Sequence, residues 1–179
     1  MNFPVNDRKA TDAVARLLEK SGGQADYLRV IKLAYLADRD SIIRRGVPIF
    51  GGHYYSMRLG PTVGEVMDFV CQRNAAGWTE HIAPRKGHKL TLTSPSTYES
   101  LSQVELDILD GVVEEHASRS TNDLVKWSHK YCAEYEYVFW GRKDIKVESI
   151  LRAGGKTADT IHRVVKEAEE LAELDAALA

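Results

Sequence analysis

The chain has 179 residues, 44% of them apolar, which is enough for one compact hydrophobic core and too few for two full domains. Its formal net charge is −2, with 14 basic and 10 acidic side chains in residues 1–100 and 10 and 16 in residues 101–179. This asymmetry comes without an arginine-rich tail, a membrane-length apolar run or a secretory signal, so we expect a single cytoplasmic domain, residues 1–179, with no membrane or direct nucleic-acid binding.

Two helices are predicted before residue 46. Apolar residues recur at helical spacing in the first, at Ala10, Ala13, Val14, Leu17 and Leu18. The second runs from Asp26 to Arg45, with an acidic residue at its start and basic residues just before Gly46. Because this second helix is apolar around most of its circumference, we expect it to lie at the centre of the fold.

Glycine and proline interrupt the helical pattern after Gly46, and residues 53–55 are predicted to form a loop or a short strand. The pair Gly60-Pro61 is typical of a helix start, because proline at the first helical position loses only an amide hydrogen that would have no partner. Residues 78–93 contain apolar segments on both sides of a polar turn with Gly87, which predicts a two-stranded hairpin.

The C-terminal half is also predicted to be helical. Ser102 and Glu105 are spaced as a capping box, which predicts a helix over 103–116. Ser120 or Thr121 can cap the next helix, and the aromatic stretch 131–140 has no clear assignment. Residues 157–179 form a long amphipathic helix with an acidic side. The expected fold is therefore mainly α, a compact bundle of about seven helices with one small β-hairpin.

No pattern in the sequence indicates catalysis or a metal site. None of the six histidines has a metal-ligand spacing, and the two cysteines are far apart and are expected to be reduced thiols. Asp38 and Asp40 point in different directions on a helix, so they do not form an acid–base pair, and Asp38 is expected to be a buried acceptor. Ser128 and His129 diverge in the same way. We therefore expect no enzyme activity, metal or cofactor.

The remaining candidates are protein-binding residues. Tyr54, Tyr55 and Arg58 combine two aromatic rings with a guanidinium, the side chains that are enriched at interface hot spots. The alternative for the tyrosines is a place in the core with hydrated hydroxyl groups. Arg85 and Lys86 belong to the basic tip of the predicted hairpin, a common place for a partner to dock.

A longer residue pattern runs through much of the chain. Its first half consists of Lys32, Leu33, Tyr35, Leu36, Ala37, Asp38, Gly46, Pro48, Ile49, Gly51, Tyr54, Gly60 and Pro61. Its second half consists of Leu101, Ser102, Glu105, Leu106, Leu109, Asp123, Leu124, Ser128 and His129. Over about residues 10–150 the chain therefore resembles the Panacea or SocA-like antitoxin family.

The resemblance implies an antitoxin of a toxin–antitoxin system. Such a protein neutralises a cognate protein toxin, encoded by an adjacent gene, by direct binding and without an active site. We expect the signature residues to be structural rather than to contact the toxin, namely Lys32, Tyr35, Asp38, Gly51, Gly60, Pro61 and His129.

Three alternatives remain open. Some relatives are thought to be adaptors that present a toxin to a protease such as a AAA+ protease, which requires a second binding surface. A small-ligand binder or an enzyme would use a groove between Tyr35, Tyr54 and His129. A phage-derived or mobile-element accessory protein would bind a partner outside toxin control. The helix over 157–179 either folds back on the domain or packs against a second copy or a toxin.

Overall fold

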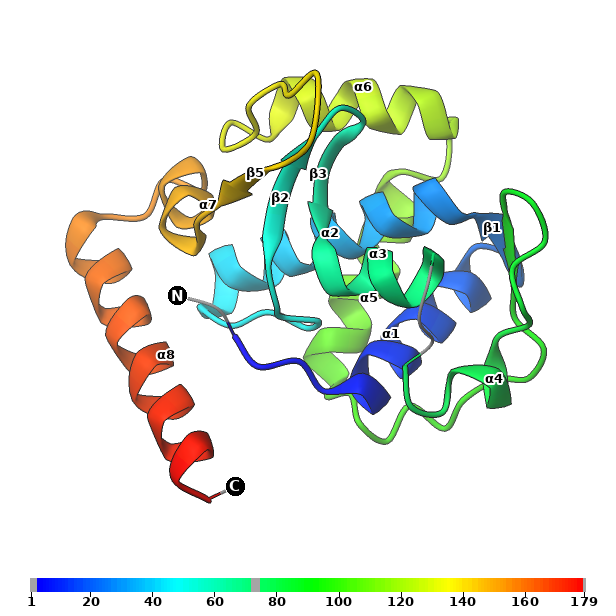
Figure 1. Cartoon of the computed structure of the whole chain (residues 1–179), viewed down its shortest axis with the longest axis horizontal. Coiled ribbons are helices and arrows are strands. Elements are labelled where there is room, and N and C mark those ends of the chain that lie inside the picture. The colour runs from blue at the N-terminus through cyan, green and yellow to red at the C-terminus, as the bar shows by residue number, and fades with distance from the viewer. Residues whose placement is uncertain (1–2, 72–74, 179) are drawn as a thin grey trace.

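The computed structural model describes residues 3–71 and 75–178 of the chain (Figure 1). Over these residues it contains eight helices and five short strands, which form two separate small sheets. The expectation of about seven helices with one small hairpin is therefore wrong, because it lacks most of the β structure. The helices are α1 Asp7–Lys20, α2 Tyr27–Arg45, α3 Gly64–Cys71, α4 Trp78–His81, α5 Gln103–Glu115, α6 Thr121–Tyr131, α7 Val147–Ala153 and α8 Ala158–Leu178. The strands are β1 Gln24–Asp26, β2 Tyr54–Met57, β3 Gly60–Val63, β4 Lys89–Thr91 and β5 Lys143–Ile145.

Helix α2 lies at the centre of the molecule, as its apolar circumference predicted (Figure 1). It contacts α1, α5, α6 and α7, and the strand β3 crosses another of its faces. Its start is fixed by the Asp26 side chain, which accepts a hydrogen bond from the Leu28 amide at 2.9 Å. Its end is Gly46, at a φ of 80°, where a left-handed conformation suits glycine. The side chains of α2 therefore reach several parts of the structure at once.

The caps of α5 and α6 also follow from the sequence. At α5 both bonds of the Ser102–Glu105 capping box are present, and the helix ends at Glu115. At α6 it is Ser120 that caps, with its hydroxyl oxygen accepting from the Asp123 amide at 3.1 Å. These local patterns are satisfied by residues three apart, so the sequence alone is enough to predict them.

A three-stranded antiparallel sheet with the order β3-β2-β5 lies across α2 (Figure 1). The predicted helix start at Gly60-Pro61 is wrong, because both residues belong to β3 and Pro61 lies opposite Ser56. Proline is tolerated there because β3 is an edge strand and the missing amide removes no hydrogen bond from the sheet interior. Helix α3 begins at Gly64, directly after this strand.

The second sheet pairs β1 with β4, which are more than 60 residues apart in sequence. The hairpin predicted over 78–93 is only partly present. Its first residues form the short helix α4, and its two arms meet at the isolated bridges Ile82 with Leu92 and Lys86 with Lys89. The second arm of the predicted hairpin contains β4, which pairs as a regular strand with β1 instead.

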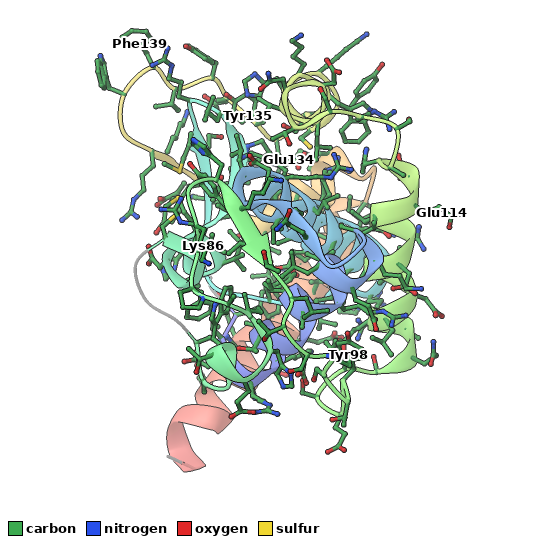
Figure 2. All side chains as sticks on the ribbon, turned by 90° about the vertical axis from the view of Figure 1, so that its right-hand side faces the viewer. Lys86, Tyr98, Glu114, Glu134, Tyr135 and Phe139 are labelled. Atoms are coloured by element: carbon green, nitrogen blue, oxygen red, sulfur yellow. The ribbon has the colours of Figure 1, made fainter. Side chains whose placement is uncertain are left out.

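Helix α8 lies at one edge of the molecule, and both views show its C-terminal end projecting away from the other elements (Figures 1 and 2). Its first half is docked, since Ile161 and Ala168 are buried and Val164 packs closely against Gly46. This part of the helix folds back on the domain. Among the described helices, none combines the length and the apolarity that crossing a bilayer requires.

Candidate interaction surface

A group of large apolar side chains is exposed where the β2–β3 turn meets the loop before β5. Leu59 is 51% exposed, Phe139 is 57% exposed and Trp140 is 80% exposed, and we call these three residues the hydrophobic rim. The Phe139 and Trp140 rings meet edge to face, with 5.3 Å between their centroids. Large apolar side chains gathered at one exposed place are typical of a binding surface rather than of a solvated loop.

All three rim residues border one cavity of about 360 Å³, which we call the rim cavity. Its walls are mostly aliphatic, aromatic or thioether side chains from α2, α3, the β2–β3 hairpin and the loop. The lining residues are Tyr27, Leu28, Ile31, Lys32, Met57, Arg58, Leu59, Thr62, Met67, Cys71, Phe139, Trp140 and Gly141. The methionines give such a surface the ability to adapt to different apolar groups.

The loop that carries the rim is attached to the rest of the fold at its first residues. The Glu134 carboxylate is fully buried and accepts a hydrogen bond from the Tyr35 hydroxyl at 2.6 Å and from Arg39 Nε at 2.7 Å. The Tyr135 hydroxyl donates to the Met57 carbonyl at 3.0 Å, and the Glu136 amide donates to the Ser56 hydroxyl at 3.1 Å. In Figure 2 Glu134 lies toward α2, while Phe139 lies at the outer end of the same loop.

Arginine side chains also hold the rim in place. The Arg58 guanidinium lies 5.6 Å from the centre of the Phe139 ring, and the Arg142 guanidinium lies 4.2 Å from that of Tyr55. These contacts are within the range of cation–π attraction. Neither arginine has a carboxylate partner among the residues that the structure describes. The surface around the rim therefore presents positive charge together with apolar area.

Lys32 is the buried cation of the rim cavity. Only 1% of it is exposed, and its Nζ donates to the Pro61 carbonyl at 2.5 Å and to the Thr62 hydroxyl at 3.1 Å. Both acceptors are neutral, and burial lowers the pKa of Lys32 to about 7. An ammonium group thus lies beside an apolar cavity without a counter-ion among the described residues.

Asp38, one turn further along α2 than Tyr35, shapes the segment that leads to the hairpin. Its carboxylate accepts from the amides of Ile49 at 2.7 Å, Phe50 at 2.8 Å and Gly51 at 3.1 Å, and from the Tyr54 hydroxyl at 2.9 Å. Burial raises the pKa of Asp38 to about 6, although these hydrogen bonds act in the opposite direction. Asp38 is the buried acceptor that its position on the helix predicted.

The residues that the sequence suggested for partner binding fall into a buried group and an exposed group. Tyr54 and Tyr55 are buried, so they support the surface rather than form it. Arg58, Arg85 and Lys86 are exposed. The Arg85 guanidinium lies 4.7 Å from the centre of the Tyr27 ring, which itself lines the rim cavity. Arg58 therefore lines the rim cavity, and Arg85, 27 residues away in sequence, contacts one of its lining residues.

The groove proposed between Tyr35, Tyr54 and His129 is occupied by internal contacts. Tyr35 and Tyr54 are buried with their hydroxyls bonded to Glu134 and Asp38, respectively. The His129 ring stacks on Tyr135 at 4.5 Å between centroids. Burial, and then the charge of Lys32, lower the pKa of His129. These three side chains thus make contacts within the fold, and none of them lines the rim cavity.

Sequence reasoning missed Leu59, Phe139 and Trp140. The only signal for Phe139 and Trp140 was a concentration of aromatic residues in a stretch without helical or strand periodicity. Such a stretch can be either a buried irregular segment or an exposed one. Its exposure depends on the pairing of β5 with β2, which joins residues about 90 positions apart.

A family model described as "Antitoxin SocA-like, Panacea domain" matches residues 30–134, which is more than half of the chain. The chain belongs to this family. No curated protein and no solved structure was found to match it. Membership indicates an antitoxin-type role and, with it, a toxin as the kind of partner.

The match to the Panacea family divides the candidate surface into two parts. Residues 30–134 include Lys32, the β2–β3 hairpin and, at the last matched position, the anchor Glu134. Phe139 and Trp140 lie beyond the match, on the loop that this anchor holds.

In the described part of the chain, no group of three or more histidine, cysteine, aspartate or glutamate side chains is arranged to hold a metal ion.

Proposed function

We propose that this Panacea-family protein is an antitoxin that neutralises a cognate protein toxin by binding it directly through the hydrophobic rim. The observation that carries the proposal is the exposure of Leu59, Phe139 and Trp140 around a cavity, in a chain that belongs to an antitoxin family. Aromatic and arginine side chains supply most of the binding energy at many protein interfaces, and Arg58 stands beside this rim. Binding alone is sufficient for this role, so we propose no catalytic step.

The test is growth of a host that expresses the adjacent gene, with and without this protein. We expect the neighbouring product to be toxic and wild-type protein to relieve the toxicity. The double variant Phe139→Ala, Trp140→Ala is expected to lose rescue, because both side chains are exposed and contribute little to the core. Val104→Ala is the matched control, since Val104 is 52% exposed but does not line the rim cavity.

Purified proteins then give the direct measurement. We expect the toxin to co-elute with wild-type protein and with the Val104→Ala variant, and to bind the double variant at least tenfold more weakly. A harmless neighbour, or full rescue by a double variant that folds normally, would contradict the proposed function. A circular dichroism melt of each variant verifies that the fold is intact.

Delivery of the toxin to a protease is the alternative mechanism, and it requires a second surface. A separate cavity of about 280 Å³ lies between α2, α5 and α6 and is lined by charged residues of both signs, including Arg39, Asp40 and Glu115. The two mechanisms differ in the fate of the toxin, because blocking leaves the amount of toxin unchanged whereas delivery shortens its half-life.

A further inference from the structure

The rim cavity has a second property besides apolarity, which is its one-sided charge. None of its described lining residues is acidic, and two of them, Lys32 and Arg58, are cationic. A third cation, Arg85, lies against Tyr27 at the edge of the cavity. Burial raises the pKa of the Cys71 thiol, which lines the cavity. Arg85 lowers this pKa, and the nearby carboxylate of Asp68 raises it.

Lys32 makes this charge distribution specific. An ammonium group has three N–H donors, and two of them are used, for Pro61 and Thr62. No described residue accepts the third. A buried ammonium without a carboxylate is costly, and a partner that supplies one recovers part of this cost. Lys32 and Thr62 both line the cavity, so a carboxylate bound in it would lie next to these two residues.

We propose that the rim cavity binds an apolar side chain of the toxin with a carboxylate next to it, so that the toxin presents an acidic, hydrophobic segment to this face. This inference rests on the proposed function and names the chemistry of the partner. The apolar walls bury the side chain, the buried charge of Lys32 attracts the carboxylate through the cavity wall, and Arg58 attracts further acidic residues at the rim.

The groups around Lys32 determine how binding responds to pH. His129 of α6 and the thiol of Cys132 are close enough to interact electrostatically with it, and Arg58, Cys71 and Tyr27 line the same cavity. Burial raises the pKa of Cys132 to about 12, so this thiol stays uncharged near neutral pH. Because burial lowers the pKa of Lys32 to about 7, Lys32 loses charge as the pH rises through neutrality. A carboxylate bound beside it restores the proton, so binding takes up protons and weakens from pH 7 to pH 9.

The probe is a pair of synthetic peptides, one with leucine and glutamate at helical spacing and one with every glutamate replaced by glutamine. The full-length protein is labelled at its methionine methyl groups, because Met57 and Met67 both line the rim cavity. We expect the acidic peptide to shift both methyl resonances and to bind at least tenfold more tightly than its glutamine counterpart. Met57→Leu and Met67→Leu assign the resonances.

Two variants test the roles of the cations. Lys32→Met keeps an unbranched side chain, one atom shorter, but removes the charge, and is expected to abolish proton uptake measured by calorimetry in two buffers at pH 8. Arg58→Gln is expected to reduce the salt dependence of binding and to leave proton uptake in place. Lys126→Gln is the control, since Lys126 is exposed on α6 and does not line the cavity. Should Lys32→Met prove unfolded by circular dichroism, the buffer comparison on the wild-type protein decides the point.

The outcomes separate this inference from the proposed function. Equal binding of both peptides, or no shift of the Met57 and Met67 methyls at millimolar peptide, overturns the acidic-segment inference. If the toxin is nevertheless neutralised through Phe139 and Trp140, the proposed function stands without it. The alternative occupant is the acidic C-terminal segment 169–179 of a second copy. Self-association that shifts the same methyls and disappears when residues 169–179 are removed would assign the cavity to that segment and overturn the toxin assignment.

Discussion

Asp38 shows at the residue scale how a single buried side chain orders a distant segment. Its carboxylate holds three consecutive amides, of Ile49, Phe50 and Gly51, and also the Tyr54 hydroxyl. These bonds set the path of the chain from the end of α2 into β2. The signature residues Asp38, Gly51 and Tyr54 therefore form one hydrogen-bonded unit.

The variant Asp38→Asn is expected to lower the free energy of unfolding by about 2–4 kcal/mol at pH 7, because an amide NH₂ group would face backbone donors in a buried site. Asp40→Asn is the matched control on the same helix. Asp40 pairs with Arg44 at 2.8 Å in a partly exposed position. The control should cost less than about 1 kcal/mol. Urea unfolding of both variants measures the difference, and similar losses would contradict the role given to Asp38.

Stability is also expected to depend on the charge of Asp38. Its pKa is raised to about 6 in the folded protein from an ordinary 3.8, so between these pH values the folded state holds a proton that the unfolded state has lost. The free energy of unfolding contributed by this group therefore rises as the pH falls from 6 to 4, by at most about 3 kcal/mol.

Comparison with Asp38→Asn isolates this effect, because the other titrating groups are common to both proteins. We expect the stability advantage of the wild type over the variant to be larger at pH 4.5 than at pH 7. Urea unfolding at the two pH values measures it. An advantage that does not change with pH would show that Asp38 titrates normally in the folded protein.

At the element scale, the β2–β3 hairpin depends on one glycine. Gly60 has a φ of 99°, and a Cβ atom there would lie 2.7 Å from the hydroxyl oxygen of Ser128. Ser128 is fully buried, and its hydroxyl donates to the Val125 carbonyl at 2.8 Å. The turn therefore approaches α6 more closely than any side chain at this position allows.

Gly60→Ala is expected to destabilise the protein for two reasons, the left-handed backbone and the contact with Ser128. Gly22→Ala serves as control, because Gly22 has a φ of 86° and open space around its Cβ position. In the control, the free energy of unfolding should fall only by the cost of the left-handed backbone, about 1–2 kcal/mol. We expect Gly60→Ala to cost about 2 kcal/mol more than the control in chemical unfolding, through overpacking. Equal costs would mean that α6 yields freely to the new methyl group.

The sequence predicted helices much better than sheets, and the reason lies in where each signal is located. The bounds of α2 follow from Asp26 and Gly46, and those of α5 from a capping box, so each signal lies within or beside its own helix. The strands β2 and β3 have four residues each and are buried on nearly all of them, so they show no alternation between apolar and polar positions. Their third partner, β5, is contributed by a segment about 90 residues away.

The candidate surface was predictable only in part, for the same reason. Arg58 and Arg85 were proposed from their residue types; Arg58 lines the rim cavity, and Arg85 contacts Tyr27, which lines it. Tyr54 and Tyr55 were proposed on the same grounds but are buried. Exposure at these positions depends on the sheet packing across α2, which no local pattern in the sequence encodes. Phe139 and Trp140 could not be placed without β5.

On the scale of the whole molecule, α8 combines a docked half and a projecting half. Ile161 and Ala168 are buried in the first half, whereas the acidic residues Glu169, Glu170 and Glu173 are exposed further along. The docked half contacts α7, and its Val164 lies against Gly46 at the end of α2. The helix therefore contributes unequally to stability along its length.

Two truncations test this division. Removing residues 169–179 is expected to change the free energy of unfolding by less than about 0.5 kcal/mol, because Glu169, Glu170 and Glu173 are exposed. Removing residues 158–179 also exposes the apolar contacts of Ile161, Val164 and Ala168, and should cost about 3 kcal/mol. Far-UV circular dichroism during urea unfolding distinguishes the two. Unchanged stability after the longer truncation would mean that the helix is not docked in solution.

The hydrogen bonds of Glu134 have a consequence for the thermodynamics of association. A flexible loop loses conformational entropy when it binds, at about 0.5–1.5 kcal/mol for each side chain that becomes immobilised. Here Tyr35 and Arg39 fix the start of the loop from the central helix, and β5 fixes its end. Phe139 and Trp140 are therefore displayed on a loop that is ordered before any partner arrives, and complex formation can proceed close to rigid-body docking.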